Sequence, residues 1–362
     1  MHKLPGPFRS PRLFRHGGAA LPGRAPVLDF SVSVNPLGPP VSVLEALHRE
    51  LPAIARYPDP ESRVLTRCLA EFHGVDPAQV IVANGSNELI YAIARAFAGR
   101  RAAIVEPTFT EYLRATLTAH GTVDHWLPEE PSFQPQPFDP EGPQLVWLGN
   151  PNNPTGRRWS REVLISWMEA FPATHFVVDE AFLPFQADEE AQSVIPVLDR
   201  LPNAVVLRSV TKVYTLPGLR LGYAVLSPRQ AERLRPQLAP APWSVNSLAQ
   251  VAGLVALQDA PFLARTRAWL PAARDQLREQ LAGLHADLDP IPSEANFLLL
   301  RLKANGLTAD RLTRRLGEHG VAIRDASNFV GLDDRFIRVA VRTAADHEAL
   351  LDALRRVLAE GR

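Results

Sequence analysis

Short apolar runs alternate with longer amphipathic runs through the middle of the chain, and no other feature constrains the fold as much. The short runs have the length and apolar content of buried strands, whereas the runs at 86–99 and 160–171 repeat apolar residues at helical spacing. This order predicts an α/β fold whose mostly parallel central sheet carries helices on its faces. The predicted strands are 102–107, 145–151, 175–182, 204–210 and 222–227.

The last third of the chain has a different pattern, which indicates a second α/β unit. A long helical stretch at 244–284 is followed by short apolar runs that helical runs separate. These apolar runs lie at 296–302, 321–327 and 336–341. We therefore predict a large domain at 41–265 and a smaller α/β C-terminal domain at 266–362, which an N-terminal arm at 1–40 joins.

Charge and cysteine content exclude several classes of function. The 39 basic and 39 acidic residues give a formal net charge of zero, which argues against a general nucleic-acid binder. The single cysteine, Cys68, allows no internal disulfide, and no apolar run is long enough for a membrane span. The basic N-terminus lacks the apolar core of a secretory signal. We therefore predict a cytoplasmic protein without a metal centre.

Two polar turns next to predicted elements are suited to hold a ligand. The sequence ANGSNELI places Gly85 in a tight turn and puts Ser86 and Asn87 at a helix start, where free N–H groups and a hydroxyl suit a phosphate. The sequence GNPNNPTG directly follows a predicted strand, and its prolines make the turn rigid. Asn153 would therefore present a fixed amide at the strand end.

Two charged residues lie where isolated charges are unusual. Asp179 ends a predicted buried strand, and a buried carboxylate requires a cationic or protonated partner. Lys212 lies in SVTKVYTLPGLRLGY among apolar and small residues. A solitary lysine is most often a solvated surface charge, so only its neighbours suggest another role. Three of them can contact a phosphate: Ser209, Thr211 and Arg220.

Together these four stretches contain the groups that pyridoxal 5'-phosphate (PLP) requires. The cofactor aldehyde needs a lysine amine, which Lys212 supplies. Its pyridine nitrogen needs a carboxylate, which Asp179 supplies, and its phosphate needs a helix N-terminus and a cation. Partial desolvation and nearby positive charge would lower the pKa of Lys212 and favour the free amine. We therefore predict PLP as the cofactor.

The order of these motifs resembles the class I/II aminotransferase family of fold-type I PLP enzymes. Gly-Ser-Asn, Asn-Pro-Thr-Gly, Asp-Glu-Ala, Ser-x-x-Lys and Gly-Leu-Arg-Leu-Gly-Tyr follow one another as in that family, over nearly the whole chain. The resemblance implies that Lys212 and Asp179 are catalytic. It also implies a homodimer in which Tyr57 reaches the cofactor phosphate of the neighbouring subunit. The other implied cofactor contacts are Gly85, Ser86, Asn87, Phe109, Asn153, Ser209, Thr211 and Arg220.

One position departs from the family pattern. Many relatives carry Tyr where this chain has Phe182, three residues after the acid, and Phe cannot donate a hydrogen bond to the ring hydroxyl of the cofactor. The resemblance places Asn153 on this hydroxyl and Phe109 against the ring. Tuning of the cofactor would therefore rest more on Asn153.

The resemblance also indicates a substrate. Arg338 matches the arginine that grips the substrate α-carboxylate in this family, and a guanidinium suits a carboxylate. The motifs at 16–18 and 29–40 resemble the threonine-phosphate decarboxylases of cobalamin biosynthesis. Histidinol-phosphate aminotransferases usually have Glu where Val34 lies and Gly near Arg342. Further candidate substrate residues are His16, Asn35, Arg324 and Arg342.

This finer resemblance implies decarboxylation of L-threonine O-3-phosphate to an aminopropanol phosphate. Three alternatives remain: a PLP-dependent aminotransferase of the histidinol-phosphate type, a ligand-sensing module of a transcription regulator, and a catalytically silent scaffold. The short N-terminal arm leaves no room for the DNA-binding helices of a regulator. The presence of Lys212, Asp179 and Arg220 argues against a silent scaffold.

Overall fold

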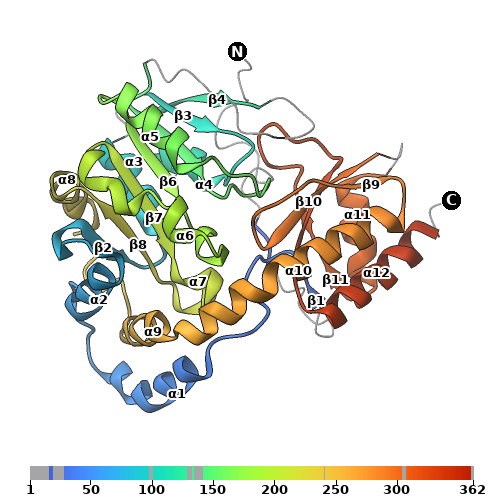
Figure 1. The fold of residues 1–362 in the computed structure, drawn as a ribbon, viewed down its shortest axis with the longest axis horizontal. Helices are drawn as coiled ribbons and strands as arrows, with labels where there is room; N and C mark the ends of the chain where they lie inside the picture. Colours follow the sequence, from blue (N-terminus) through green and yellow to red (C-terminus); the bar gives the residue numbers. More distant parts are fainter. Residues whose placement is uncertain are drawn as a thin grey trace.

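A seven-stranded sheet forms the centre of the larger part of the molecule, as a computed structural model of the chain shows (Figure 1). Among its described strands only β8 (Gly222–Leu226) runs antiparallel to the rest, between β2 (Val80–Ala83) and β7 (Ala204–Ser209). Beyond β7 follow, in order, β6 (His175–Asp179), β5 (Leu145–Gly149), β3 (Arg101–Val105) and β4 (Thr122–Trp126). The structure describes residues 16–18, 28–97, 101–128, 133, 142–239, 241–303 and 307–359.

Helices cover both faces of this sheet. On one face, α3 (Ser86–Phe97), α4 (Glu111–Thr118) and α8 (Pro228–Leu238) pack against alternate residues of the strands. The helices on the opposite face are α2 (Arg63–His73), α5 (Arg161–Ala170) and α9 (Ser247–Gln258). Successive side chains of a strand point to opposite faces, so a sheet covered on both sides needs continuously apolar strands. The predicted α/β fold with a mostly parallel sheet is confirmed.

A smaller α/β unit forms the C-terminal end of the chain, at the right of Figure 1. Its four-stranded antiparallel sheet has the order β12-β13-β10-β9, and a separate parallel pair joins β1 (Leu28–Asp29) to β11 (Val321–Ala322). The N-terminal segment therefore pairs with the last third of the chain. The remaining elements are β9 (Leu288–Pro290), β10 (Phe297–Leu302), β12 (Arg324–Asp325), β13 (Phe336–Ala340), α11 (Ala309–Glu318) and α12 (Ala344–Ala359).

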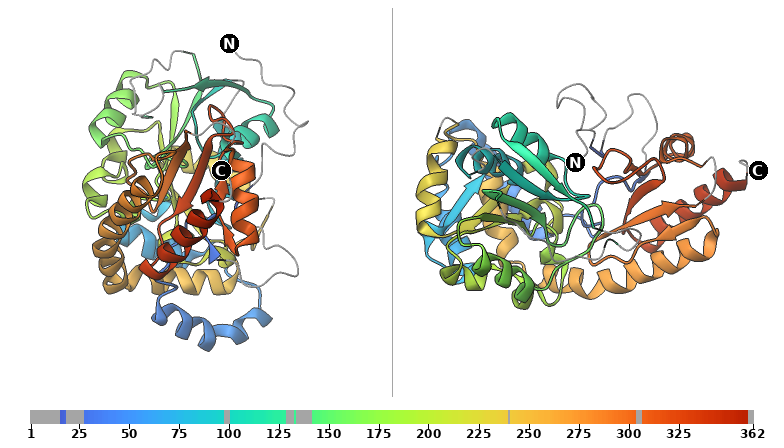
Figure 2. Two further views of the ribbon diagram at one scale, coloured as in Figure 1. Left: turned by 90° about the vertical axis from the view of Figure 1, so that its right-hand side faces the viewer. Right: turned by 90° about the horizontal axis from the view of Figure 1, so that it is seen from above.

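The helix α10 (Ala260–Leu284) connects the large and small units, and the right view of Figure 2 shows it running from one to the other. The division that we predict after residue 265 falls inside this helix, so the domain limits stay a prediction. α1 (Val41–Glu50) packs on α9 at the lower edge of Figure 1. Two short helices complete the large unit: α6 (Glu189–Gln192) and α7 (Val210–Val213).

No single helix within the described ranges is long and apolar enough to cross a membrane. α9 and α10 reach the required length and composition only as a pair, and the pair is bent by 71°. In this structure both helices bury apolar side chains in the core, among them Ala252 of α9 and Leu277 of α10.

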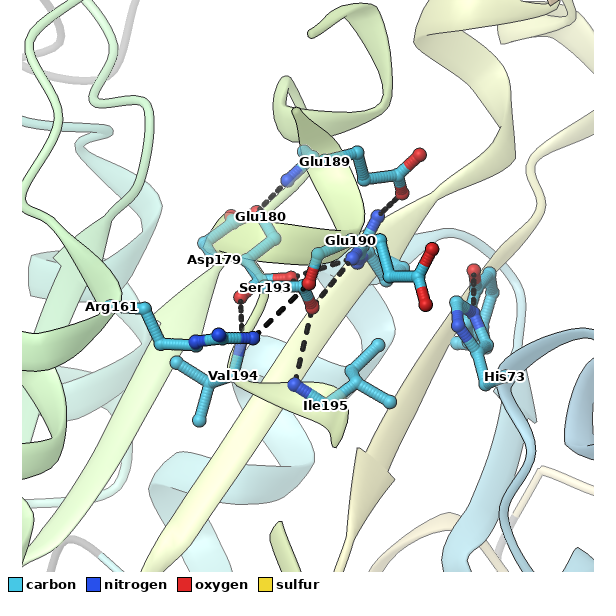
Figure 3. Close-up of polar contacts among 12 residues, drawn as sticks. His73, Arg161, Asp179, Glu180, Glu189, Glu190, Ser193, Val194 and Ile195 are labelled. Atoms are coloured by element: carbon cyan, nitrogen blue, oxygen red, sulfur yellow. Dashed lines mark hydrogen bonds and ion pairs between the residues drawn. The ribbon is translucent and has the colours of Figure 1, made fainter. Parts of the chain in front are cut away.

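A cluster of charged side chains is buried beneath the carboxyl ends of β6 and β7 (Figure 3). Arg208 and Glu180 are 2% and 0% exposed, and Arg208 Nη2 lies 2.7 Å from Glu180 Oε2 and 2.9 Å from Ser193 Oγ. Arg208 also pairs with Glu189, which in turn pairs with Arg267 of α10. Burial opposes the charged form, but the two glutamates hold the pKa of Arg208 above its ordinary value. The cluster therefore ties both strand ends to α10.

We expect Arg208→Ala to lower the free energy of unfolding by roughly 3–5 kcal/mol, because it leaves the Glu180 carboxylate buried without its cation. Urea unfolding of the purified protein measures this change. Arg158→Ala is the matched control, since Arg158 pairs with Asp188 and Glu294, whose side chains are 43% and 39% exposed. Such outer pairs contribute at most about 1 kcal/mol. Equal losses in the two variants would contradict a special role for the cluster.

Candidate active site

A cavity of about 480 Å³ opens at the carboxyl ends of the parallel strands, where side chains of the small unit complete its wall. Ligands of open α/β sheets bind at this edge. The sequence motifs therefore converge there although they lie far apart in the chain. The sequence-predicted residues that line the cavity are His16, Gly85, Ser86, Asn87, Phe109, Asn153, Asp179, Ser209, Thr211, Lys212, Arg220, Arg324 and Arg338.

The turn between β2 and α3 forms a cradle for an anion. Gly85 has φ +81, and a Cβ at this position would lie 2.4 Å from Arg220 Nη2, so only glycine lets the guanidinium come this close to the helix start. Asn87 Oδ1 is buried there and has no hydrogen-bond partner among the described residues. The hydroxyls of Ser209 and Thr211 lie 2.7 Å apart beside the same cavity.

Lys212 lies on the short helix α7 directly after β7, and its Nζ is 5.8 Å from the centre of the Phe182 ring. Burial lowers the pKa of Lys212 to about 8, and the charges of Arg338 and Arg220 act in the same direction. At pH 7 about a tenth of the Lys212 side chains are therefore neutral amines, far more than for a lysine with the ordinary pKa. A neutral amine is the form that attacks a carbonyl group.

Asp179 faces the same cavity from the end of β6. Burial raises the pKa of Asp179 above its ordinary value, and two hydrogen bonds act against this rise. The Tyr112 hydroxyl donates to Oδ2 at 2.7 Å, and the Ala181 N–H donates to Oδ1 at 3.0 Å. Each carboxylate oxygen therefore has a donor.

The turn that carries Asn153 is held by its neighbour in the sequence. Asn152 Nδ2 donates to the Pro107 carbonyl at 2.8 Å, and the Thr108 hydroxyl donates to Asn152 Oδ1 at 2.6 Å. These bonds join the loops after β3 and β5. Asn153 Oδ1 accepts a hydrogen bond from Arg338 Nη1, so the predicted cofactor amide and the predicted substrate guanidinium are neighbours.

Two guanidinium groups of the small unit face the cavity. Arg324 and Arg338 are directly opposite each other on the paired strands β12 and β13. Arg338 Nη2 donates to the Ser31 carbonyl at 2.9 Å, and Arg324 Nη2 donates to Asn328 Oδ1 at 2.7 Å. Burial, together with the neighbouring Arg324, lowers the pKa of Arg338 to about 9, so it is still a cation at neutral pH. Two adjacent buried cations favour an anionic ligand.

A buried carboxylate holds His16 at the wall of the cavity. His16 Nε2 lies 2.9 Å from Glu111 Oε1, and the Tyr91 hydroxyl donates to Glu111 Oε2 at 2.8 Å. Burial opposes ionisation, but these bonds hold the pKa of Glu111 below its ordinary value. Glu111 therefore fixes the orientation of the His16 ring, which also packs 5.7 Å from the ring of Phe109.

The structure does not bring three of the sequence-predicted residues into the cavity. Asn35 is fully buried, and its Nδ2 donates to the Val213 carbonyl and to Thr266 Oγ1, both at 2.8 Å. Arg342 lies two residues after the end of β13, and its Nε is 3.1 Å from Asp346 Oδ2. Because these polar groups are used to connect segments, we leave Asn35 and Arg342 out of the proposed site. Tyr57 is 82% exposed on the surface of this single chain.

The decisive comparison is with a family model, described as aminotransferase class I and II, which matches residues 25–357. The chain belongs to this family. It is 40% identical to threonine-phosphate decarboxylase of Salmonella typhimurium, over 95% of this chain and 96% of that protein. It is 36% identical to histidinol-phosphate aminotransferase 2 of Methylococcus capsulatus, over 92% and 90%. The structure of L-threonine-O-3-phosphate decarboxylase from Porphyromonas gingivalis matches with a TM-score of 0.82 and 32% identity, over 91% and 99%.

This member of the aminotransferase class I and II family is a PLP-dependent enzyme, and its cavity fits the cofactor. The cradle at Gly85, where the Arg220 guanidinium lies close to the start of α3, would take the phosphate. Lys212 would bind the aldehyde carbon, and Asp179 would hold the pyridine nitrogen. When bound, PLP withdraws electrons from a bond at the substrate Cα.

The motifs of this family member do not point to Tyr112 or Glu111, although both line the cavity. Both residues belong to PTFTEY, from which the sequence suggests only Phe109 as a ligand. Their position at the start of a helix after a predicted strand is a general signal for a ligand-facing residue. Their partners Asp179 and His16 are 67 and 95 residues away, and only the folded chain shows these pairs.

Proposed function

We propose that this enzyme decarboxylates L-threonine O-3-phosphate to (R)-1-aminopropan-2-yl phosphate, a step of cobalamin biosynthesis. The observation that carries the proposal is the pair of guanidinium groups, Arg324 and Arg338, which face the cavity in addition to the cofactor cradle at Arg220. The substrate has two anionic groups, a carboxylate and a phosphate, so it needs cations beyond those that hold the cofactor. The 40% identity to threonine-phosphate decarboxylase supports the same function.

The donors at the substrate end of the cavity divide between these two anionic groups. Arg338 lies next to Asn153 and binds the α-carboxylate through its two parallel N–H groups. Arg324 and His16 bind the phosphate. Histidinol phosphate has a phosphate but no α-carboxylate, so it would leave Arg338 without an anion, whereas the phosphorylated amino acid supplies an anion to Arg324 and to Arg338.

The side chains of this enzyme then have separate tasks in the reaction. Arg338 would hold the substrate α-carboxylate and so orient the bond from Cα to the carboxylate carbon, which breaks to release carbon dioxide. Asp179 would hold the pyridine nitrogen of PLP, and PLP when bound takes up the electron pair that this bond leaves behind. Lys212, protonated at Nζ, would then donate a proton to Cα in place of the lost carboxylate.

Homodimers are typical of this family, and we propose that Tyr57 reaches the cofactor phosphate of the partner subunit. Its hydroxyl-bearing ring is 82% exposed and packs 5.0 Å from Trp243, which is itself exposed. The neighbouring segment exposes the apolar side chains of Val41, Leu51 and Ile54. A partner subunit would cover this apolar surface and bring Tyr57 to its cavity.

A pair of assays tests the proposed reaction. We expect the purified enzyme with PLP to release one carbon dioxide for each L-threonine O-3-phosphate consumed, without any 2-oxo acid as co-substrate. The same enzyme with histidinol phosphate and 2-oxoglutarate should form glutamate at least about a hundredfold more slowly, because the cavity discriminates through paired charges. If glutamate forms faster than carbon dioxide is released, the enzyme is an aminotransferase and the proposed decarboxylase function is wrong.

A further inference from the structure

Among the described residues, Tyr112 is the one whose side-chain hydroxyl donates a hydrogen bond to the carboxylate of Asp179. It lies in the first turn of α4, is 2% exposed, and donates to Asp179 Oδ2 at 2.7 Å. The other carboxylate oxygen, Oδ1, accepts from the backbone N–H of Ala181. The side chain of Tyr112 is therefore the one replaceable donor in this pair.

The ring of Tyr112 is held in place by its surroundings. It stacks on Trp147 of β5 with 5.2 Å between ring centres and an angle of 7° between the planes. Trp147 Nε1 donates to Thr116 Oγ1 at 3.2 Å, and the Thr116 hydroxyl donates to the Tyr112 carbonyl at 2.9 Å. Because the ring cannot turn away without breaking these contacts, its hydroxyl has a fixed direction.

We propose that Tyr112 is a positioning residue for the cofactor, which orients the Asp179 carboxylate and keeps it ionised to hold the pyridine nitrogen of PLP protonated. A hydrogen bond to the charged form of a carboxylate stabilises that form. The carboxylate needs this help because burial favours its neutral form. Burial also raises the pKa of the Tyr112 phenol well above its usual range, so the group remains a neutral donor.

Other charged groups also act on Asp179 and Tyr112. Lys212 on α7 and Arg208 on β7 also favour the ionised form of Asp179, and Glu106, after β3, acts on Tyr112. Loss of the Tyr112 hydroxyl should therefore weaken the interaction of Asp179 with the cofactor without abolishing it. The proposal depends on the cofactor and not on which substrate is decarboxylated.

Tyr112→Phe tests the proposal, because it removes the hydroxyl and keeps the ring on Trp147. We expect the dissociation constant of PLP to rise about tenfold, the cost of one hydrogen bond to a charged group. We also expect the pH midpoint of the visible absorbance change of bound PLP to rise by about half a unit. The reason is that a less protonated ring nitrogen draws fewer electrons from the linkage to Lys212, which then holds its proton to higher pH.

Tyr223→Phe is the matched control for the loss of a buried tyrosine hydroxyl. Tyr223 is buried in β8, its hydroxyl lies 2.8 Å from His73 Nε2, and it does not line the cavity (Figure 3 shows His73). We expect this variant to keep the absorbance midpoint and the PLP dissociation constant within twofold of the original protein. The proposal is overturned when Tyr112→Phe also keeps both values, or when both variants change them equally.

A second replacement covers the case in which Tyr112→Phe does not fold. Incorporation of 3-fluorotyrosine at position 112 keeps the ring and the hydroxyl but makes the phenol a stronger donor. The pH midpoint of bound PLP should then move downward, opposite to the effect of phenylalanine. An unchanged midpoint in a folded 3-fluorotyrosine protein would show that this hydroxyl does not act on the cofactor.

Discussion

We expect Lys212→Ala to abolish the covalent attachment of PLP and to lower the rate of decarboxylation by a factor on the order of 10⁴ or more, because the reaction loses its amine. The chain has three lysines, at positions 3, 212 and 303. Lys303 is about half exposed, and its Nζ lies 3.1 Å from Asp289 Oδ2. Among the described residues, Lys212 is therefore the one lysine that lines the cavity.

Borohydride reduction measures the attachment directly. The reduced cofactor should appear as an added mass on the peptide that contains Lys212, and Lys212→Ala should show neither this mass nor the visible absorbance band. Lys303→Ala is the control and should retain both. A reduced PLP adduct on the Lys212→Ala protein would contradict the assignment of Lys212 as the residue that binds PLP covalently.

The groups that hold the cofactor could be predicted from the sequence because the topology of the sheet leaves them little choice. Asp179 is the last residue of β6, and Gly85, Asn153 and Lys212 lie in the segments just after β2, β5 and β7, whose carboxyl ends meet at one edge. The sequence predicts these strands except β2, whose turn it recognises from the helix that follows. A motif at the end of a predicted strand therefore has a nearly fixed place in space. The fold class was predictable for the same reason, since both rest on recognising buried strands.

The substrate side of the site could be predicted less well, because it is built from long-range contacts. Asn35 and Arg342 lie in motifs that resemble the family, yet Asn35 is tied to Val213 and Arg342 to Asp346. The sequence pattern does not show that Asn35 and Arg342 will form hydrogen bonds with these distant or neighbouring residues instead of with a substrate. The same limit applies to Glu111, because its partner His16 lies 95 residues away and only the folded chain shows this contact.

The structure also adds a physical reason for the low pKa of Lys212. The sequence predicts this shift from desolvation and from the nearby Arg220, and both contribute. The charge of Arg338, however, lowers this pKa more than the charge of Arg220 does, and Arg338 belongs to the small unit, 126 positions after Lys212. Movement of the small unit relative to the sheet would therefore change the charge next to the reactive amine.

We expect Arg338→Ala to lower kcat/KM for L-threonine O-3-phosphate by roughly 10²–10³-fold, since truncation of one partner of a buried charge pair costs about 2–5 kcal/mol. KM should rise because Arg338 binds the carboxylate, and kcat should fall because the same contact orients the bond that breaks, whereas the phosphate cradle at Arg220 stays intact. Steady-state kinetics measure the effect on the substrate, and the absorbance of bound PLP measures the effect on the cofactor. Arg338→Lys keeps the charge but loses the paired N–H groups, so it should recover only part of the loss.

Arg342→Ala is the control that distinguishes the cavity from its surroundings. Arg342 lies four residues from Arg338 on the same segment, but it pairs with Asp346 and does not line the cavity, so its loss should change kcat/KM by less than about threefold. Arg338→Ala must also keep the PLP affinity of the original protein. An equal loss of substrate and cofactor affinity would mean that Arg338 holds Asn153 and Ser31 in place rather than the substrate carboxylate, because both are its partners in this structure.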